Sequence, residues 1–120
     1  METHLDEIDD GILVLVADGG LDMRNARELG EKLTTLVDSG IRDLIVDCSK
    51  LTFISSAGLG TLLMVNRKLN GKGGRVHLAG ASGPVAQAIQ LAGLNTLLGS
   101  HQDVGRAKHA LRRTSAPESG

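Results

Sequence analysis

Aromatic side chains are almost absent from this sequence of 120 residues, which contains one Phe and neither Trp nor Tyr. Proteins that bind single-stranded nucleic acids stack the bases on aromatic rings, so this mode of binding is excluded. The formal net charge of −1 provides no field that would attract nucleic acid or an anionic membrane. Hydrophobic residues nevertheless make up 41% of the chain. We therefore expect one domain with an aliphatic core.

Cysteine is also scarce. Cys48 is the only one, so the chain can form no intramolecular disulfide and no cysteine cluster for a metal. No apolar run approaches the length of a membrane span, and the acidic start, with Glu2, Asp6 and Glu7, differs from a signal peptide. We expect a cytoplasmic protein without a metal or cofactor, which contacts neither membrane nor nucleic acid directly.

The periodicity of apolar residues predicts strands that alternate with helices. Asp9-Asp10-Gly11 is typical of a tight hairpin turn between the first two strands. Strands are expected at 5–8, 12–17, 41–47, 75–79 and 96–98, and helices at 23–38, 57–69, 84–92 and 104–113. The order predicts an α/β domain in which a mixed sheet of about five strands packs against about four helices. Residues 1–113 form this domain, and residues 114–120 are predicted to be a disordered tail.

The stretch 45–60 is the centre of the predicted domain, because it contains a buried strand, a polar turn and the start of a helix. Ser55 and Ser56 stand where that helix begins. Only one of the two serines can be the N-cap, so the other exposes its hydroxyl in the first turn. A phosphate there would meet unpaired N–H groups and the positive end of the helix dipole. A partner docked on the same surface would face an added charge of about −1.5 to −2.

A longer motif around these serines carries a resemblance to a known family. Asp47-x-Ser49-x-Leu51-x-Phe53-Ile54-x-Ser56-x-Gly58-Leu59-Gly60 resembles the central motif of bacterial anti-sigma-factor antagonists, which belong to the STAS-domain family. The likeness extends over about Leu5 to Leu111. Gly19-x-Leu21-Asp22 matches the family's first loop, although Gly20 replaces a frequent glutamate.

The resemblance implies a partner-switching protein that is not an enzyme. Unphosphorylated members bind an anti-sigma factor that is also a GHKL-type serine kinase; phosphorylation releases them, and a PP2C-type phosphatase restores them. By position, Ser56 is the phosphoacceptor. Many members have an aspartate before the acceptor, so Ser55 is an alternative acceptor here. The partner-binding residues implied are Asp22, Ser55, Ser56, Ala57, Gly58, Leu59 and Gly60.

Several of these residues have simpler structural explanations, and other functions remain open. Asp22 can be only a helix cap, and Asp47 can bond the backbone of the Cys48–Lys50 turn. The alternative function is a STAS scaffold or regulatory subunit of a lipid-transport, stressosome-like or secretion system. An enzyme with Ser56 as its nucleophile is disfavoured because the first glycine of a Gly-x-Ser-x-Gly elbow is missing. We expect a monomer, with a weak dimer as the alternative.

Overall fold

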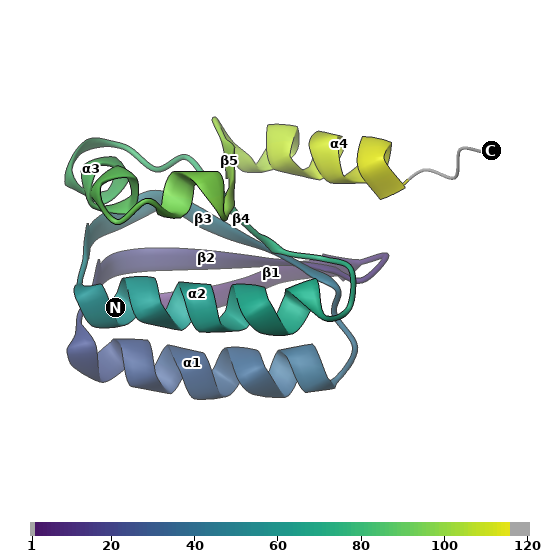
Figure 1. Cartoon of the computed structure of the whole chain (residues 1–120), viewed down its shortest axis with the longest axis horizontal. Helices are drawn as coiled ribbons and strands as arrows, with labels where there is room; N and C mark the ends of the chain where they lie inside the picture. Colours follow the sequence, from purple (N-terminus) through teal and green to yellow (C-terminus); the bar gives the residue numbers. More distant parts are fainter. Residues whose placement is uncertain (1, 116–120) are drawn as a thin grey trace.

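A five-stranded sheet covered by helices forms the domain in the computed structural model, which describes residues 2–115 (Figure 1). The strands lie in the order β1-β2-β3-β4-β5. The β1–β2 pair is antiparallel and the other three pairs are parallel, so the predicted mixed sheet is confirmed. The elements are β1 (Glu2–Asp9), β2 (Ile12–Leu21), α1 (Met23–Asp38), β3 (Asp43–Ile54), α2 (Ser56–Asn70), β4 (Val76–Ala79), α3 (Gly83–Leu91), the 3₁₀ turn η1 (Leu94–Thr96), β5 (Gly99–His101) and α4 (Val104–Ser115).

The first two strands form the predicted hairpin. Asp10 and Gly11 connect them with φ angles of 54° and 79°. Two consecutive positive φ angles define the turn that matches the twist of paired strands, and Asp-Gly is among the sequences that adopt it most easily. The pairing continues to Glu2, opposite Asp18.

The two faces of the sheet carry separate apolar layers. The larger layer lies under α1, α2 and α3, and Figure 1 shows α1 and α2 side by side along the sheet. Its fully buried side chains include Leu13, Leu33, Leu44, Leu62 and Leu69, each worth roughly 1.5–3 kcal/mol of burial. The smaller layer lies under α4 and comprises Ile12, Val14, Ile45, Ala79, Ala107 and Leu111.

Strands β2 and β3 are longer than predicted. We expected them to end at Ala17 and Asp47, but they continue to Leu21 and Ile54 because the two polar extensions pair with each other. The pairing register shifts between Val16 and Asp18 and again between Gly19 and Gly20. Such bulges break the simple alternation of buried and exposed residues from which strands are predicted.

The last strand was also misplaced. The predicted strand at 96–98 is wrong: η1 and its following turn occupy this region, and β5 is Gly99–His101. Gly93 has a φ of 74°, which begins the tight turn, and Leu98 donates a backbone hydrogen bond of 2.8 Å to Leu94. Helix α4 includes Thr114 and Ser115, which we had placed in the tail, while residues 116–120 lie outside the described residues.

Two histidines join β4 to β5 on the face under α4. His77 Nδ1 lies 3.0 Å from His101 Nε2, while His77 Nε2 lies 3.8 Å from Asp43 Oδ1. With the His77 proton on Nε2, the nitrogen that faces the carboxylate, Nδ1 accepts and His101 Nε2 donates. Gly99 pairs with His77 across the strands, and a side chain at Gly99 would collide with the His77 ring. Partial burial, the His77 ring and the charge of Arg75 lower the pKa of His101.

Acidification should therefore weaken the fold through His101. The pKa of His101 in the folded protein lies below the ordinary 6.5. The free energy of unfolding therefore includes the full contribution of neutral His101 above about pH 6.5, and this contribution is lost as the pH falls towards the folded pKa. One proton limits the slope to about 1.4 kcal/mol per pH unit. Urea unfolding between about pH 5 and 7.5 measures it, and His101→Gln, whose amide can still donate to His77, should reduce the slope. Equal slopes in both proteins would contradict the assignment.

Candidate partner-binding and phosphorylation site

The starts of α1 and α2 lie next to each other at the carboxyl ends of β2 and β3. Leu21 pairs with Ile54 in the last register position of the two strands. The pairing extends one residue further, because the Ser55 amide donates a hydrogen bond of 2.8 Å to the Leu21 carbonyl. After one further residue, β2 is followed by α1 and β3 is followed by α2. Side chains from both turns thus lie on one surface, at the edge where α/β domains usually place their sites.

The two serines have different roles at the start of α2. Ser55 is the N-cap: its Oγ accepts a hydrogen bond of 3.1 Å from the Gly58 amide, and its carbonyl accepts one of 3.0 Å from Leu59. Ser56 is the first residue of the helix, and its side chain is exposed. The expectation that one serine caps and the other faces solvent is confirmed.

Asp22 caps the neighbouring helix. Its Oδ1 accepts a hydrogen bond of 2.9 Å from the Asn25 amide, and the residue is exposed. Asn25 Nδ2 in turn donates a bond of 2.8 Å to the Gly20 carbonyl, which ties α1 to the end of β2. Capping is thus confirmed for Asp22, and its position beside the start of α2 also allows contact with a partner.

Gly58 and Gly60 are two residues apart in α2, and the packing of the domain requires a glycine at only one of these positions. A Cβ at Gly58 would lie 2.8 Å from two side-chain atoms of Leu21 and 2.9 Å from Ile54, closer than carbon atoms approach in folded proteins. Gly58 is therefore required by internal packing. A Cβ at Gly60 would have no neighbour within 4 Å, although glycine in a helix costs roughly 0.5–1 kcal/mol relative to alanine. Within residues 2–115, packing gives no reason for a glycine at position 60.

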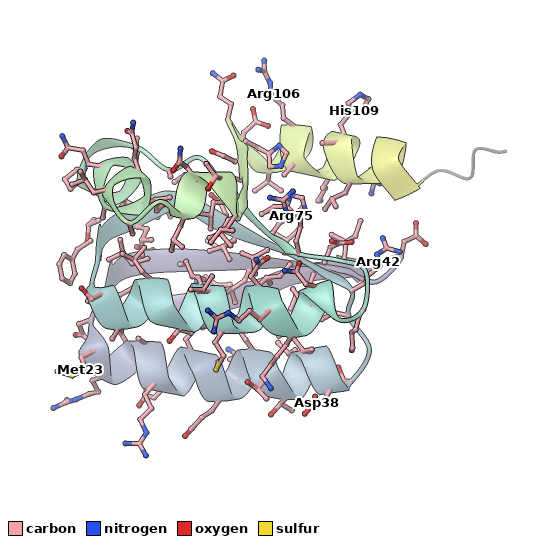
Figure 2. All side chains as sticks on the ribbon, in the orientation of Figure 1. Met23, Asp38, Arg42, Arg75, Arg106 and His109 are labelled. Carbon is pink, nitrogen blue, oxygen red and sulfur yellow. The ribbon has the colours of Figure 1, made fainter. Side chains whose placement is uncertain are left out.

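Exposed apolar side chains flank the serines, and they are not among the site residues predicted from the sequence. Met23 is 74% exposed at the start of α1 (Figure 2), and Phe53 is 50% exposed near the end of β3. Phe53 pairs with Gly20, so its ring lies over a position without a side chain. The sequence contains a signal for this exposure. Phe53 and Ile54 are adjacent apolar residues, and a strand whose side chains alternate between its faces can bury only one of the two.

Two other polar candidates, Asp47 and Cys48, have structural explanations. Asp47 Oδ1 accepts a hydrogen bond of 3.0 Å from the Ser49 amide, which confirms the local interaction, although it lies within β3 and not in a turn. Cys48 is buried, and burial together with the charge of Asp47 raises the pKa of its thiol to about 12. A thiol with that pKa stays protonated at neutral pH.

Two kinds of site are not found among the described residues. Among residues 2–115, no group of three or more His, Cys, Asp or Glu side chains is arranged to hold a metal ion. The same residues include no helix that is both long and apolar enough to cross a bilayer. Ser56 presents an exposed hydroxyl at one of two neighbouring helix starts, and Met23 and Phe53 are exposed apolar side chains on the same elements or the strand before them. Such a surface fits contact with another protein that a modification can regulate.

The geometry defines an α/β domain with an exposed serine at a helix start, next to the start of a second helix. A sequence model of the STAS domain matches residues 5–107. The chain belongs to the STAS domain family.

Individual proteins similar to this chain are anti-sigma factor antagonists. BtrV of Bordetella bronchiseptica, assigned as an anti-sigma factor antagonist, is 32% identical over 93 residues, which cover 78% of this chain and 79% of BtrV. The crystal structure of an anti-sigma factor antagonist from Mycobacterium paratuberculosis has a TM-score of 0.81 and 28% identity, covering 92% of this chain and 93% of that one.

The fold is also that of SpoIIAA. The unphosphorylated form of this anti-sigma factor antagonist has a TM-score of 0.79 and 23% identity, and covers 94% of this chain and 96% of SpoIIAA. SpoIIAA, described as a Bacillus cell fate determinant, has also been solved in its phosphorylated form. The relatives are regulatory proteins and not enzymes, in agreement with the sequence-based prediction.

The separate roles of the two serines can be tested by stability measurements on alanine variants. Ser55→Ala should lower the free energy of unfolding by about 1 kcal/mol, because the Gly58 amide loses its acceptor. Ser56→Ala should change it by less than about 0.5 kcal/mol, because no cap is lost. Urea denaturation of both variants and the wild type measures the difference. A larger loss for Ser56→Ala than for Ser55→Ala would show that the cap has been assigned to the wrong serine.

Proposed function

We propose that this chain is an anti-sigma factor antagonist that works by partner switching. The unphosphorylated form binds an anti-sigma factor with GHKL-type serine kinase activity. Phosphorylation of Ser56 releases the antagonist, and a PP2C-type phosphatase restores it. The observation that carries the proposal is the exposed hydroxyl of Ser56 beside a serine that already caps the helix.

The position of Ser56 lets a phosphate change binding without unfolding the domain. The phosphate would lie at the start of α2, where the helix dipole stabilises negative charge. The same charge, held against a docked protein, would be removed from water without a compensating partner, which costs several kcal/mol. Each 1.4 kcal/mol is tenfold in affinity, so a loss of about a hundredfold or more is expected.

The geometry favours Ser56 over Ser55 as the acceptor. Ser55 is only partly exposed, and its Oγ accepts the Gly58 amide. A kinase would have to disrupt this cap to place the Ser55 hydroxyl in line with ATP. Ser56 is exposed and needs no such rearrangement. Release of the partner therefore follows most directly from a phosphate on Ser56.

The exposed apolar residues supply a contact surface around the acceptor. Met23 and Phe53 are large side chains that lose water contact when a partner docks, and such anchors commonly dominate binding energy. Gly60 lies one turn along α2 from Ser56 and presents bare backbone. A partner can approach the helix closely there, which accounts for a glycine that the fold does not need.

A second candidate function also has an observation in its favour. Leu91 is 87% exposed and Leu97 is 51% exposed, both away from α1 and α2. Where exposed apolar side chains form a contiguous patch, the patch marks a contact surface with another protein. A STAS scaffold or regulatory subunit would use them, and would not require transfer of phosphate to Ser56.

Phosphate transfer to Ser56 is the central test. This protein is incubated with ATP and the purified GHKL-type anti-sigma kinases of the source cell. It should gain one phosphate, and peptide mapping should find that phosphate on Ser56 alone. Ser56→Ala should accept none and keep its affinity for the kinase, whereas Ser56→Asp should bind at least about tenfold more weakly. Transfer to Ser55 alone would correct the acceptor. No transfer by any of these kinases would favour the scaffold.

Gly60 provides an independent test of the binding surface. Gly60→Gln should raise the free energy of unfolding by roughly 0.5–1 kcal/mol, because glycine is replaced by a better helix former. It should also weaken kinase binding by at least about tenfold, because the new side chain fills the space of the partner. Arg67→Gln, exposed two turns further along α2, is the matched control and should leave affinity within about twofold. Unchanged binding of Gly60→Gln, measured by calorimetry, would place the interface elsewhere.

A further inference from the structure

A second polar surface lies at the opposite end of the sheet, where β3 and β4 begin. A groove of about 440 Å³ opens there. Its lining consists of Arg42, Asp43, Gly73, Gly74, Arg75, His77 and Leu111. The 12 residues of β3 separate it from Ser55, at roughly 3.3 Å per residue. Figure 2 shows Arg42 towards one end of the sheet and Met23 at the other, with Arg75 between them.

Two arginines of this groove are held in place by hydrogen bonds that use only part of each guanidinium. Arg42 Nε donates a bond of 2.8 Å to Asp43 Oδ2, and Arg75 Nη2 donates one of 2.9 Å to the Leu97 carbonyl. Among the side chains that the structure describes, no other acceptor is bonded to either guanidinium. Each guanidinium has five N–H donors, so both retain donors for a ligand.

The buried carboxylate of Asp43 orients one arginine and does not cancel the positive charge. Asp43 is 3% exposed, and its Oδ1 accepts a bond of 3.0 Å from the Arg75 amide. Burial acts to raise its pKa, but the His77 ring, Arg42 and that amide outweigh burial and lower it. The lining of the groove thus includes two guanidinium groups, of which one is bonded to the carboxylate of Asp43 and the other to a neutral carbonyl.

The turn before β4 shapes the groove. A side chain at Gly74 would collide with the carbonyl of Arg42, so the turn packs directly on the backbone at the start of β3. Gly73 has a φ of 84°, and a Cβ there would meet nothing within 4 Å. The absence of side chains at both positions leaves the space in front of the two arginines open. Leu111 adds an apolar wall from α4.

We propose that this groove binds the phosphate group of a small phosphorylated molecule. Guanidinium groups match phosphate oxygens in charge and geometry, and their charge-assisted hydrogen bonds are short and strong. The volume exceeds that of a phosphate, so an organic group can lie against Leu111. The site is separate from Ser56 and does not depend on partner switching.

The test is an NMR titration of the ¹⁵N-labelled full chain with ribose 5-phosphate, with ribose as the ligand that lacks the phosphate. The backbone amides of Gly73, Gly74 and Arg75 should shift saturably with ribose 5-phosphate, with a Kd on the order of 1 mM or below, and should not shift with ribose. Sodium chloride at equal ionic strength controls for screening.

Matched variants decide whether the arginines are responsible. Arg75→Gln should weaken binding about tenfold or more, whereas Arg67→Gln, the same charge change outside the groove, should alter it less than about twofold. The dispersion of the amide spectra shows that both variants are folded. No saturable shift at these three amides would overturn the proposal. So would equal losses in both variants, or shifts confined to the start of α2.

Discussion

The close contact of the Gly58 backbone with the side chains of Leu21 and Ile54 is the constraint on which the site depends. It brings the start of α2 against the ends of two strands that are themselves joined by the hydrogen bond from Ser55 to Leu21. Any side chain at position 58 would push the helix away from the sheet. Since the position of Ser56 follows from that of Gly58, the exposed hydroxyl is held by packing of the core and not by contacts of its own.

This arrangement separates the stability of the helix from the chemistry at its surface. The cap, the strand pairing and the glycine contact all involve residues other than Ser56. A charge added to Ser56 changes the electrostatic surface next to Met23 and Phe53 and leaves the buried contacts in place. A switch of this kind needs no second conformation of the domain, because the difference in binding comes from the cost of burying the charge.

The order of elements and the exposed serine at the start of α2 could be predicted from the sequence because they depend on local signals. Apolar periodicity, the Asp10-Gly11 turn and paired serines before a helix each act within a few residues. The extensions of β2 and β3 could not be predicted in the same way, since each becomes a strand only by pairing with the other across bulges. The choice of Ser55 as the cap and the role of Gly58 likewise depend on contacts with Leu21, more than thirty residues away along the chain.

The freedom of Ser56 from structural duties has a consequence for how such a protein can evolve. Replacement of a residue that supports the fold is limited by the loss of stability, and most proteins have little stability to lose. Position 56 is outside that limit, because its side chain is exposed and the neighbouring serine provides the cap. Under the proposed function, a single substitution there would turn a regulated binder into a permanent one, or into one that never binds, while the folded population stays the same. After gene duplication, copies of this domain can diverge in signalling behaviour before their cores change.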